Sequence, residues 1–262
     1  RQKLAGAGGQ REIDASVAAT LYNMWRGYAI RNIIDARLAD LGLSAGSSEA
    51  IKALLNLLEQ TPYTGFAAAG IDWIPQPAAL PTESRRDLAL LTAMRDALDQ
   101  LASNELAPAF ANSTDQDDYR WGKLHRITFD HPFDSSLSIP PQGGFDNLAP
   151  DLPGLARDGG YNVVNASGFS ARATGLNSFR FGGGPVRRYV GYAGTHAIDG
   201  KNAVPGGPSG DYRDPDYATQ LATWLTADQH PVTMGSGGGG KKEVFVPAAP
   251  ADPIDGPTPG CG

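Results

Sequence analysis

The sequence predicts an α+β protein in which a helical first part is followed by a strand-rich second part. Before about residue 112, apolar residues recur at three- and four-residue steps. After it, short β-rich runs lie between clusters of Gly, Asn, Asp and Pro. The two kinds of stretch do not alternate, which argues against βαβ units. We therefore expect a helical subdomain at 1–112, a strand-rich part at 113–234 and a flexible Gly/Pro-rich tail at 235–262.

Three amphipathic helices are expected in the first part. The first covers residues 13–34 and stops before Gly42, a residue suited to a helix end. Ser47 or Ser48 caps the second helix, and Thr82 opens the third. The side chains of the last two helices that we expect to face the core are Ile51, Leu54, Leu55, Leu58, Leu88, Leu91, Met94, Leu98 and Leu101.

The second part is expected to contain short strands and one closing helix. The strands predicted from β-branched and aromatic runs are 126–129, 162–165, 178–181 and 186–190. A glycine–proline stretch, 204–210, precedes Tyr217, Leu221 and Trp224, which have helical spacing. Its glycines, Gly206, Gly207 and Gly210, permit positive φ or a close backbone approach. We expect this stretch to turn the last strand into the closing helix.

Composition and charge narrow the class of protein. The chain has 262 residues, of which 41% are hydrophobic and 19% charged, with 33 Gly and 20 Pro, and this suits a loop-rich globular protein. Its net charge is −6 and it has no dense Lys/Arg block, so we expect no nucleic-acid partner. The single cysteine, Cys261, excludes an internal disulfide. No apolar run reaches the roughly 18 residues of a membrane span.

Two patterns that resemble ligand sites are incomplete. Residues 235–241 match the G-x-x-x-x-G-K part of a P-loop, but Lys242 replaces the Ser or Thr that holds Mg²⁺, and no helix follows. Nucleotide binding is therefore not expected. His125 and His131, with Asp130, suggest a metal site, yet on a regular strand the two histidines would lie about 20 Å apart. We expect hydrogen-bonded structural histidines instead.

The sequence offers no complete catalytic constellation. Ser209 lies among glycines, but it lacks the Gly-x-Ser-x-Gly elbow and follows a proline. Asn112 and Asn165 begin formal glycosylation sequons, which are relevant only in a host that glycosylates. We therefore assign no catalytic, cofactor-binding or metal-binding residue within this chain.

An ordered series of motifs, over residues 12–232, resembles the penicillin amidase (penicillin acylase) family. The order and register of the motifs are more specific than any one of them. The matching segments are Leu21-Tyr-Asn-x-Trp25, Trp121-Gly-Lys-Leu-His125 with His131-Pro132, Asn162-Val-Val-Asn165-Ala166, Gly184-Pro185-x-x-Arg188-x-Val190, and Gly206-Gly-x-Ser209-Gly210 with Pro215, Tyr217, Gln220, Leu221 and Trp224.

This resemblance implies an N-terminal-nucleophile hydrolase with an αββα core, made as a zymogen and matured by autoproteolysis. Such enzymes hydrolyse linear amides, as in penicillins or N-acyl homoserine lactones. Their nucleophile is a serine at the start of the large β-subunit, whose own α-amine serves as the base. A backbone NH and an Asn side chain form the oxyanion hole.

The resemblance places this chain in the C-terminal portion of that β-subunit. Since the chain begins with Arg1 rather than Ser, we expect the nucleophile, the oxyanion Asn and any family calcium site on another chain of the same processed precursor. Tyr192, Asp211 and Asp216 depart from the family pattern, where an acidic residue, Asn and His are usual, and this puts the substrate in doubt. The other partner implied is a small acyl amide.

The Gly/Pro-rich tail at 235–262 indicates where the protein is located. Its Pro-rich run to Cys261 resembles the linker before a Cys-centred sorting signal. This implies export to the periplasm, the outer membrane or the exterior, with surface attachment through the tail; alternatively, Cys261 is a free thiol. The rival hypothesis for the whole chain is a non-catalytic binding or scaffold module. A co-purifying chain that starts with Ser would favour the enzyme.

Overall fold

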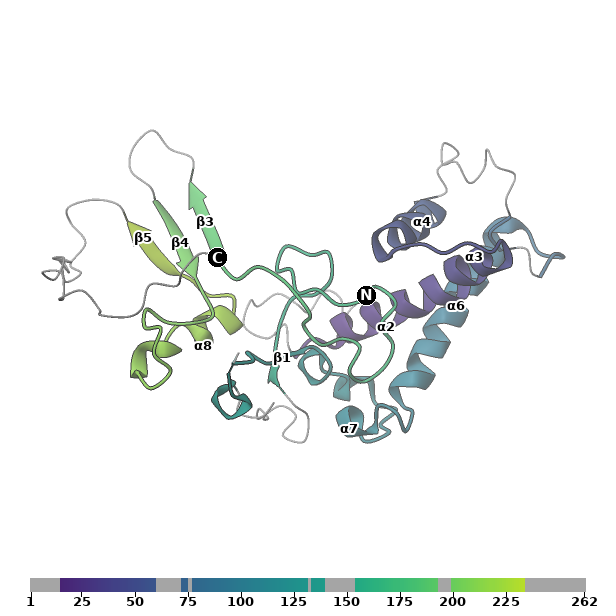
Figure 1. Ribbon diagram of the computed structural model, residues 1–262. Helices are drawn as coiled ribbons and strands as arrows, with labels where there is room; N and C mark the ends of the chain where they lie inside the picture. Colours follow the sequence, from purple (N-terminus) through teal and green to yellow (C-terminus); the bar gives the residue numbers. More distant parts are fainter. Residues whose placement is uncertain are drawn as a thin grey trace, which may run out of the picture.

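Most of the helices lie at one end of the molecule, and the three-stranded sheet lies at the other end with one short helix beside it (Figure 1). The computed structural model describes residues 15–59, 72–74, 77–131, 133–139, 154–192 and 199–233. Its helical part contains α2 (Val17–Ala29), the π-helix η1 (Ile30–Asp35), α3 (Ala36–Asp40), α4 (Ser47–Glu59), α6 (Thr82–Leu101) and α7 (Ala107–Phe110). The rest contains η2 (Gln116–Asp118), η3 (Trp121–Lys123), β1 (Arg126–Ile127), η4 (Ser135–Leu137), β2 (Leu155–Ala156), β3 (Arg188–Tyr192), β4 (Asp199–Ala203), η6 (Pro215–Tyr217), α8 (Leu221–Leu225) and β5 (His230–Thr233). This is an α+β architecture, as predicted.

The first helix is longer than predicted and has well-formed ends. Ser16 Oγ accepts a hydrogen bond from the Ala19 amide at 3.2 Å, so Ser16 caps α2. This cap was not predicted. The helix continues through η1 into α3, which ends at Asp40, and so it stops before Gly42, as expected. Gly42 has φ +69°, and the amides of Gly42 and Leu43 return to the carbonyls of Ala39 and Leu38 at 2.9 and 2.8 Å. These two bonds form a Schellman motif.

The second and third helices form as predicted, but three of their expected core residues are exposed. Leu55 is 47% exposed, Leu88 45% and Leu91 68%. Leu101 is buried as predicted, and with Ala93 and Ala97, which were not predicted, it forms the buried face of α6 at four-residue spacing. Small residues on that face allow α6 to lie close against α2, and Trp25 Nε1 donates to the Leu90 carbonyl between the two helices at 3.1 Å.

Two of the four predicted strands form, and three further strands form where none was predicted. β1 pairs with β2, and β3–β4–β5 form an antiparallel sheet with β4 in the centre. The predictions for 162–165 and 178–181 were wrong, because both segments are turns. Asn162 has φ +58°, which a strand does not accommodate. The predictions for 126–129 and 186–190 correspond to β1 and β3, whereas β2, β4 and β5 were missed.

The glycine–proline stretch turns the chain from β4 toward α8. The Gln220 amide donates to the Gly206 carbonyl at 3.0 Å, which closes the turn. A Cβ on Gly207 would overlap the Asp216 carbonyl oxygen, so this glycine permits a close backbone approach, as expected. Gly206, Gly207 and Gly210 all keep φ outside the left-handed region, since none of them is among the positive-φ glycines of the described residues. Tyr217 ends a separate 3₁₀ turn, so it does not share the closing helix with Trp224, contrary to the prediction.

Replacing Gly207 with Ala is therefore expected to lower the free energy of unfolding by about 1–3 kcal/mol, because the backbone must shift to make room. Gly210→Ala is the matched control, since nothing lies within 4 Å of a Cβ at that position. Chemical denaturation of the two variants compares them directly. Equal effects would contradict the close approach at Gly207.

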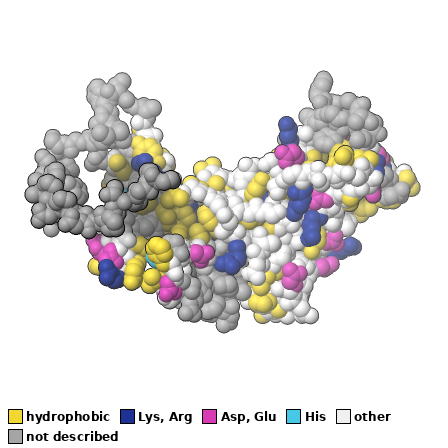
Figure 2. Space-filling view, in the orientation of Figure 1, with side chains coloured by type: hydrophobic (Ala, Val, Ile, Leu, Met, Phe, Trp, Pro, Cys, Tyr) yellow, Lys and Arg dark blue, Asp and Glu magenta, His cyan; other side chains and the backbone are white. Residues whose placement is uncertain are grey.

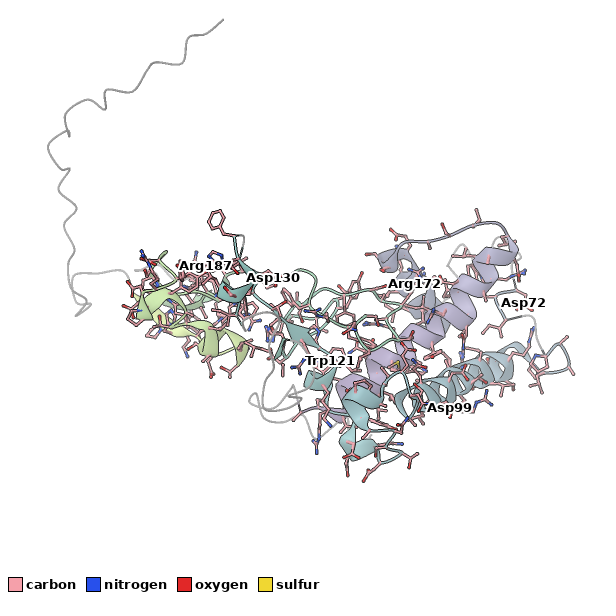
Figure 3. The ribbon with its side chains drawn as sticks, turned by 60° about the horizontal axis from the view of Figure 1, so that its bottom comes forward. Asp72, Asp99, Trp121, Asp130, Arg172 and Arg187 are labelled. Atoms are coloured by element: carbon pink, nitrogen blue, oxygen red, sulfur yellow. The ribbon has the colours of Figure 1, made fainter. Side chains whose placement is uncertain are left out.

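Three apolar clusters hold the elements together. One surrounds Trp121 and Met24, a second surrounds Ile30, Ile34 and Leu54, and a third forms around Trp224. In Figure 3, Trp121 lies near the centre of the molecule, whereas Arg172 lies beside the helices. Arg172 Nε and Nη2 donate to the two carboxylate oxygens of Asp35 at 2.6 and 2.7 Å, which ties the strand-rich part to η1.

The surface of the helical part carries mixed charge. On the face shown in Figure 2, Lys/Arg and Asp/Glu side chains are interspersed over that part. Within the described ranges, no helix is both long and apolar enough to cross a membrane.

Candidate functional site

The W-G-x-x-H motif builds the centre of the fold. The 3₁₀ turn η3 places Trp121 and His125 one above the other, with ring centroids 5.0 Å apart and planes 20° from parallel. Trp121 Nε1 donates to the Gly159 carbonyl at 2.9 Å. Both side chains have no exposed surface. The motif is therefore a packing unit that joins the helices to the loops of the second part.

His125 and Ser167 form a buried serine–histidine pair. His125 Nε2 lies 2.6 Å from Ser167 Oγ, and Nδ1 lies 2.7 Å from the Phe179 carbonyl. Since a carbonyl can only accept, the proton must be on Nδ1, and Nε2 then accepts from the Ser167 hydroxyl. Burial lowers the pKa of His125 to about 4, so the ring is neutral at physiological pH.

This proton arrangement is the one that a serine nucleophile and its base require, but the pair is closed to solvent. His125 and Ser167 are both 0% exposed. The rings of Trp121 and Phe169 pack against His125, with centroids 5.0 and 5.4 Å away. Because no substrate reaches Ser167 in this packing, the pair satisfies buried polar groups and holds the loop at 167 against η3.

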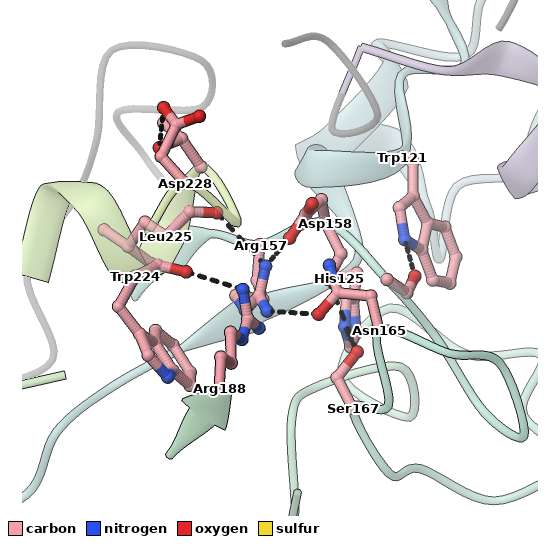
Figure 4. Close-up of polar contacts among 12 residues, drawn as sticks. Trp121, His125, Arg157, Asp158, Asn165, Ser167, Arg188, Trp224, Leu225 and Asp228 are labelled. Carbon is pink, nitrogen blue, oxygen red and sulfur yellow. Dashed lines mark hydrogen bonds and ion pairs between the residues drawn. The ribbon is translucent and has the colours of Figure 1, made fainter. Parts of the chain in front are cut away.

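A second buried polar cluster surrounds Trp224 (Figure 4). The guanidinium carbons of Arg157 and Arg188 lie 4.6 and 4.5 Å from the Trp224 ring centroid, which is cation–π geometry. Arg157 is ion-paired with Asp158 and donates to Asn165 Oδ1 at 2.8 Å. Arg157 and Trp224 are almost completely buried.

The two arginines also complete the end of α8. Arg157 Nη1 donates to the Leu225 carbonyl at 3.1 Å, and Arg188 Nη1 donates to the Trp224 carbonyl at 2.7 Å. Cations are favourable at a helix C-terminus, where carbonyls lack intrahelical partners. Burial lowers the pKa of Arg188 to about 10, which still leaves it charged at neutral pH. The cluster therefore fastens the closing helix to β3 and to the loop at 157.

The other metal-binding and catalytic candidates from the sequence lie apart from these two clusters. His131 contacts the rings of Phe133 and Tyr212, with centroids 5.6 and 5.9 Å away, and does not share a site with His125. Asp130 is exposed. Ser209 Oγ accepts from the Asp211 amide at 3.2 Å, as in a turn. Asp211 in turn pairs with Arg213 on the surface.

Neither sequon asparagine is free for glycosylation in this fold. Asn112 Nδ2 donates to the Ala102 carbonyl at 3.1 Å and to Asn104 Oδ1 at 3.0 Å, so both of its hydrogens are used. Asn165 Nδ2 is buried. Residues 235–241 and Cys261 lie outside the described residues.

Two open cavities among the described residues lie away from the serine–histidine pair. One, of about 320 Å³, lies between η1, α3 and α6 and is lined partly by Ile33, Arg37 and Leu88. The other, of about 310 Å³, lies beside Arg172 and Leu43. Within the described ranges, no three His, Cys, Asp or Glu side chains converge on a metal-sized position.

Comparison with known proteins assigns the chain to a family. The sequence model of the penicillin amidase family matches residues 3–237, which is most of the chain. No curated protein matches it. The match covers the whole ordered series of motifs that resembles this family, from the α2 helix to the closing helix α8. The chain therefore belongs to the penicillin amidase family, which implies a hydrolase acting on amides.

Proposed function

We propose that this chain is the C-terminal portion of the β-subunit of an N-acyl amide hydrolase, whose nucleophilic serine is the first residue of another chain from the same precursor. The observation that supports this is the closure of the His125–Ser167 pair. Within the described residues it is the one contact between a serine hydroxyl and a histidine ring, and solvent does not reach it. This closure supports a nucleophile that another chain supplies.

The exposed sheet supports a partner chain as well. β3 is an outer strand of its three-stranded sheet, and it carries Tyr189, Val190 and Tyr192, which are 46%, 54% and 75% exposed. Edge strands with exposed apolar side chains are normally covered. We propose that the upstream chain covers this edge and that the two chains together complete the αββα core.

The proposed chemistry follows from an N-terminal serine. The α-amine of this serine, with a near-neutral pKa, accepts the hydroxyl proton while Oγ attacks the carbonyl carbon of the substrate amide. The amine of the substrate then takes up this proton and leaves, and the acyl group stays on Oγ. Water then releases the acid. The proposed substrates are penicillins or N-acyl homoserine lactones, and any calcium site lies on the upstream chain. The proposed location is outside the cytoplasm, with the tail as a surface attachment.

Co-expression of this chain with the preceding part of its precursor tests the proposal. We expect the purified complex to contain a chain whose first residue is Ser and to release acid from penicillin G or an N-acyl homoserine lactone. The 27.5 kDa chain alone is expected to be inactive. Hydrolysis by that chain alone, or a complex without an N-terminal Ser, would sink the proposal.

A further inference from the structure

Arg26 is a buried cation without an anionic partner. It lies on α2 and is 4% exposed. Its Nε and Nη2 atoms have no hydrogen-bond partner, and it forms no ion pair within the described part of the chain. The rings of Tyr22, Tyr161 and Phe169 surround the guanidinium, with centroids 5.5, 5.4 and 5.8 Å from Cζ. Buried charges are normally paired, so this arrangement needs an explanation.

The two unpartnered atoms form the edge of the guanidinium that holds a carboxylate with two parallel hydrogen bonds. The same edge is filled elsewhere in this protein. Arg172 Nε and Nη2 bind both oxygens of Asp35 at 2.6 and 2.7 Å. Arg213 Nε and Nη2 bind those of Asp211, with the shortest contact at 2.7 Å. At Arg26 this edge is empty.

Arg188 has the same two atoms without partners, but its charge is compensated in another way. Its Nη1 donates to the Trp224 carbonyl at the C-terminal end of α8, where the helix supplies negative potential. Arg26 has no helix end beside it in its own helix, because α2 continues directly into η1 and α3. Three aromatic side chains, two of them tyrosines, face its charge, and burial lowers the pKa of Arg26.

On one side, the side chain that packs over Arg26 is itself partly exposed to solvent. Tyr22, one helical turn before it, is 46% exposed and so can move without disturbing the core. Tyr161 brings a second hydroxyl group, which lies 3.4 Å from Ser48 Oγ at the start of α4. The surroundings of Arg26 therefore contain hydroxyl donors and no carboxylate that already pairs with it.

We propose that Arg26 receives a carboxylate from outside the described residues, held by Nε and Nη2 once the Tyr22 ring has moved aside. Two sources carry this chemistry. One is an Asp or Glu side chain in the rest of the amidase polypeptide, which rests on the proposed function. The other is a free organic acid, such as the acid that amide hydrolysis releases.

The first arm of the test uses the full chain and sodium acetate. Acetate is expected to raise the thermal unfolding midpoint by a few degrees more than sodium chloride at equal ionic strength. Arg26→Met should abolish this difference, and Arg26→Lys should remove most of it, because Lys keeps the charge but not the paired donors. Arg95→Met is the matched control on α6, since the Arg95 side chain is 70% exposed.

The second arm measures association with the preceding part of the precursor. Arg26→Met is expected to weaken association on the order of 30-fold or more, since one partner of a buried charge pair is lost. The same variant alone should unfold at the same or a higher temperature than the parent, because an apolar side chain replaces an unpaired buried charge. Loss of folding therefore does not obscure the result.

Each outcome decides the proposal. An Arg26-dependent acetate shift with unchanged association supports a free acid, whereas weakened association supports a protein carboxylate. If neither measurement depends on Arg26, the proposal is wrong. The proposed function is judged separately, by an N-terminal Ser and amide hydrolysis. An inactive complex whose assembly depends on Arg26 would overturn the proposed function alone.

Discussion

Replacing Arg157 with Met is expected to lower the free energy of unfolding by about 3–5 kcal/mol. Arg157 is completely buried and is the ion-pair partner of Asp158, which is 6% exposed. Its loss leaves the Asp158 carboxylate buried without a counter-charge and takes a donor from Asn165 and from the Leu225 carbonyl. Urea denaturation followed by tryptophan fluorescence measures the effect, since Trp224 lies against the guanidinium.

Two further variants make the test specific. Arg187 is exposed and stacks on Tyr189, so Arg187→Met should cost under about 1 kcal/mol. The double variant Arg157→Met, Asp158→Asn should recover part of the loss, because it leaves no unpaired charge. A single Arg157→Met variant that is as stable as Arg187→Met would contradict the role given to the cluster.

Acid is expected to destabilise the protein through His125. The pKa of His125 is about 4 in the fold, against 6.5 for the ordinary side chain. Below pH 6.5 the unfolded chain therefore binds a proton that the folded chain does not, so the free energy of unfolding falls as the pH drops toward 4. Above pH 6.5 this contribution is fully present. The difference corresponds to roughly 3 kcal/mol over that interval.

Unfolding measured from pH 7.5 to 4.5 tests this, with variants to isolate the histidine. His125→Asn should flatten the dependence, although the variant is less stable throughout because its packing is lost. His131→Asn is the matched control for replacing a histidine, since His131 is partly exposed and lies outside the buried pair. Titration of the His125 ring by NMR with a midpoint above 6 would rule out this explanation.

The helices could be predicted from the sequence because their signals are local. Gly42 and the serines at 47 and 48 mark a helix end and a helix start that the structure has, and periodicity identified α4 and α6. The inward face of α6 was predicted in part: Leu101 is buried as expected, but Ala93 and Ala97 were missed, and Leu88 and Leu91, on other sides of the helix, stay exposed. Apolar periodicity does not distinguish a small buried residue from a larger exposed one.

The strands and the polar clusters depend on distant partners, which local patterns do not contain. β4 reads Asp-Gly-Lys-Asn-Ala and the short β5 contains Pro231, so neither has a clear strand pattern, and both are defined by their pairing. No local pattern in the sequence identified Ser167 as the partner of a histidine, since His125 is 42 residues away. Arg157 likewise meets Leu225 across 68 residues. The assignment of no catalytic residue to this chain stays a prediction.

The stack of Trp121 on His125 affects how the W-G-x-x-H motif should be used in genome searches. In this chain the tryptophan and histidine are both inaccessible, and their hydrogen bonds end on backbone carbonyls and on Ser167. Selection that keeps W-G-x-x-H would then act on the ability to fold, even in a descendant that has lost its chemistry. Sequences retrieved by this signature share an architecture, and each one's activity must be argued from its nucleophile.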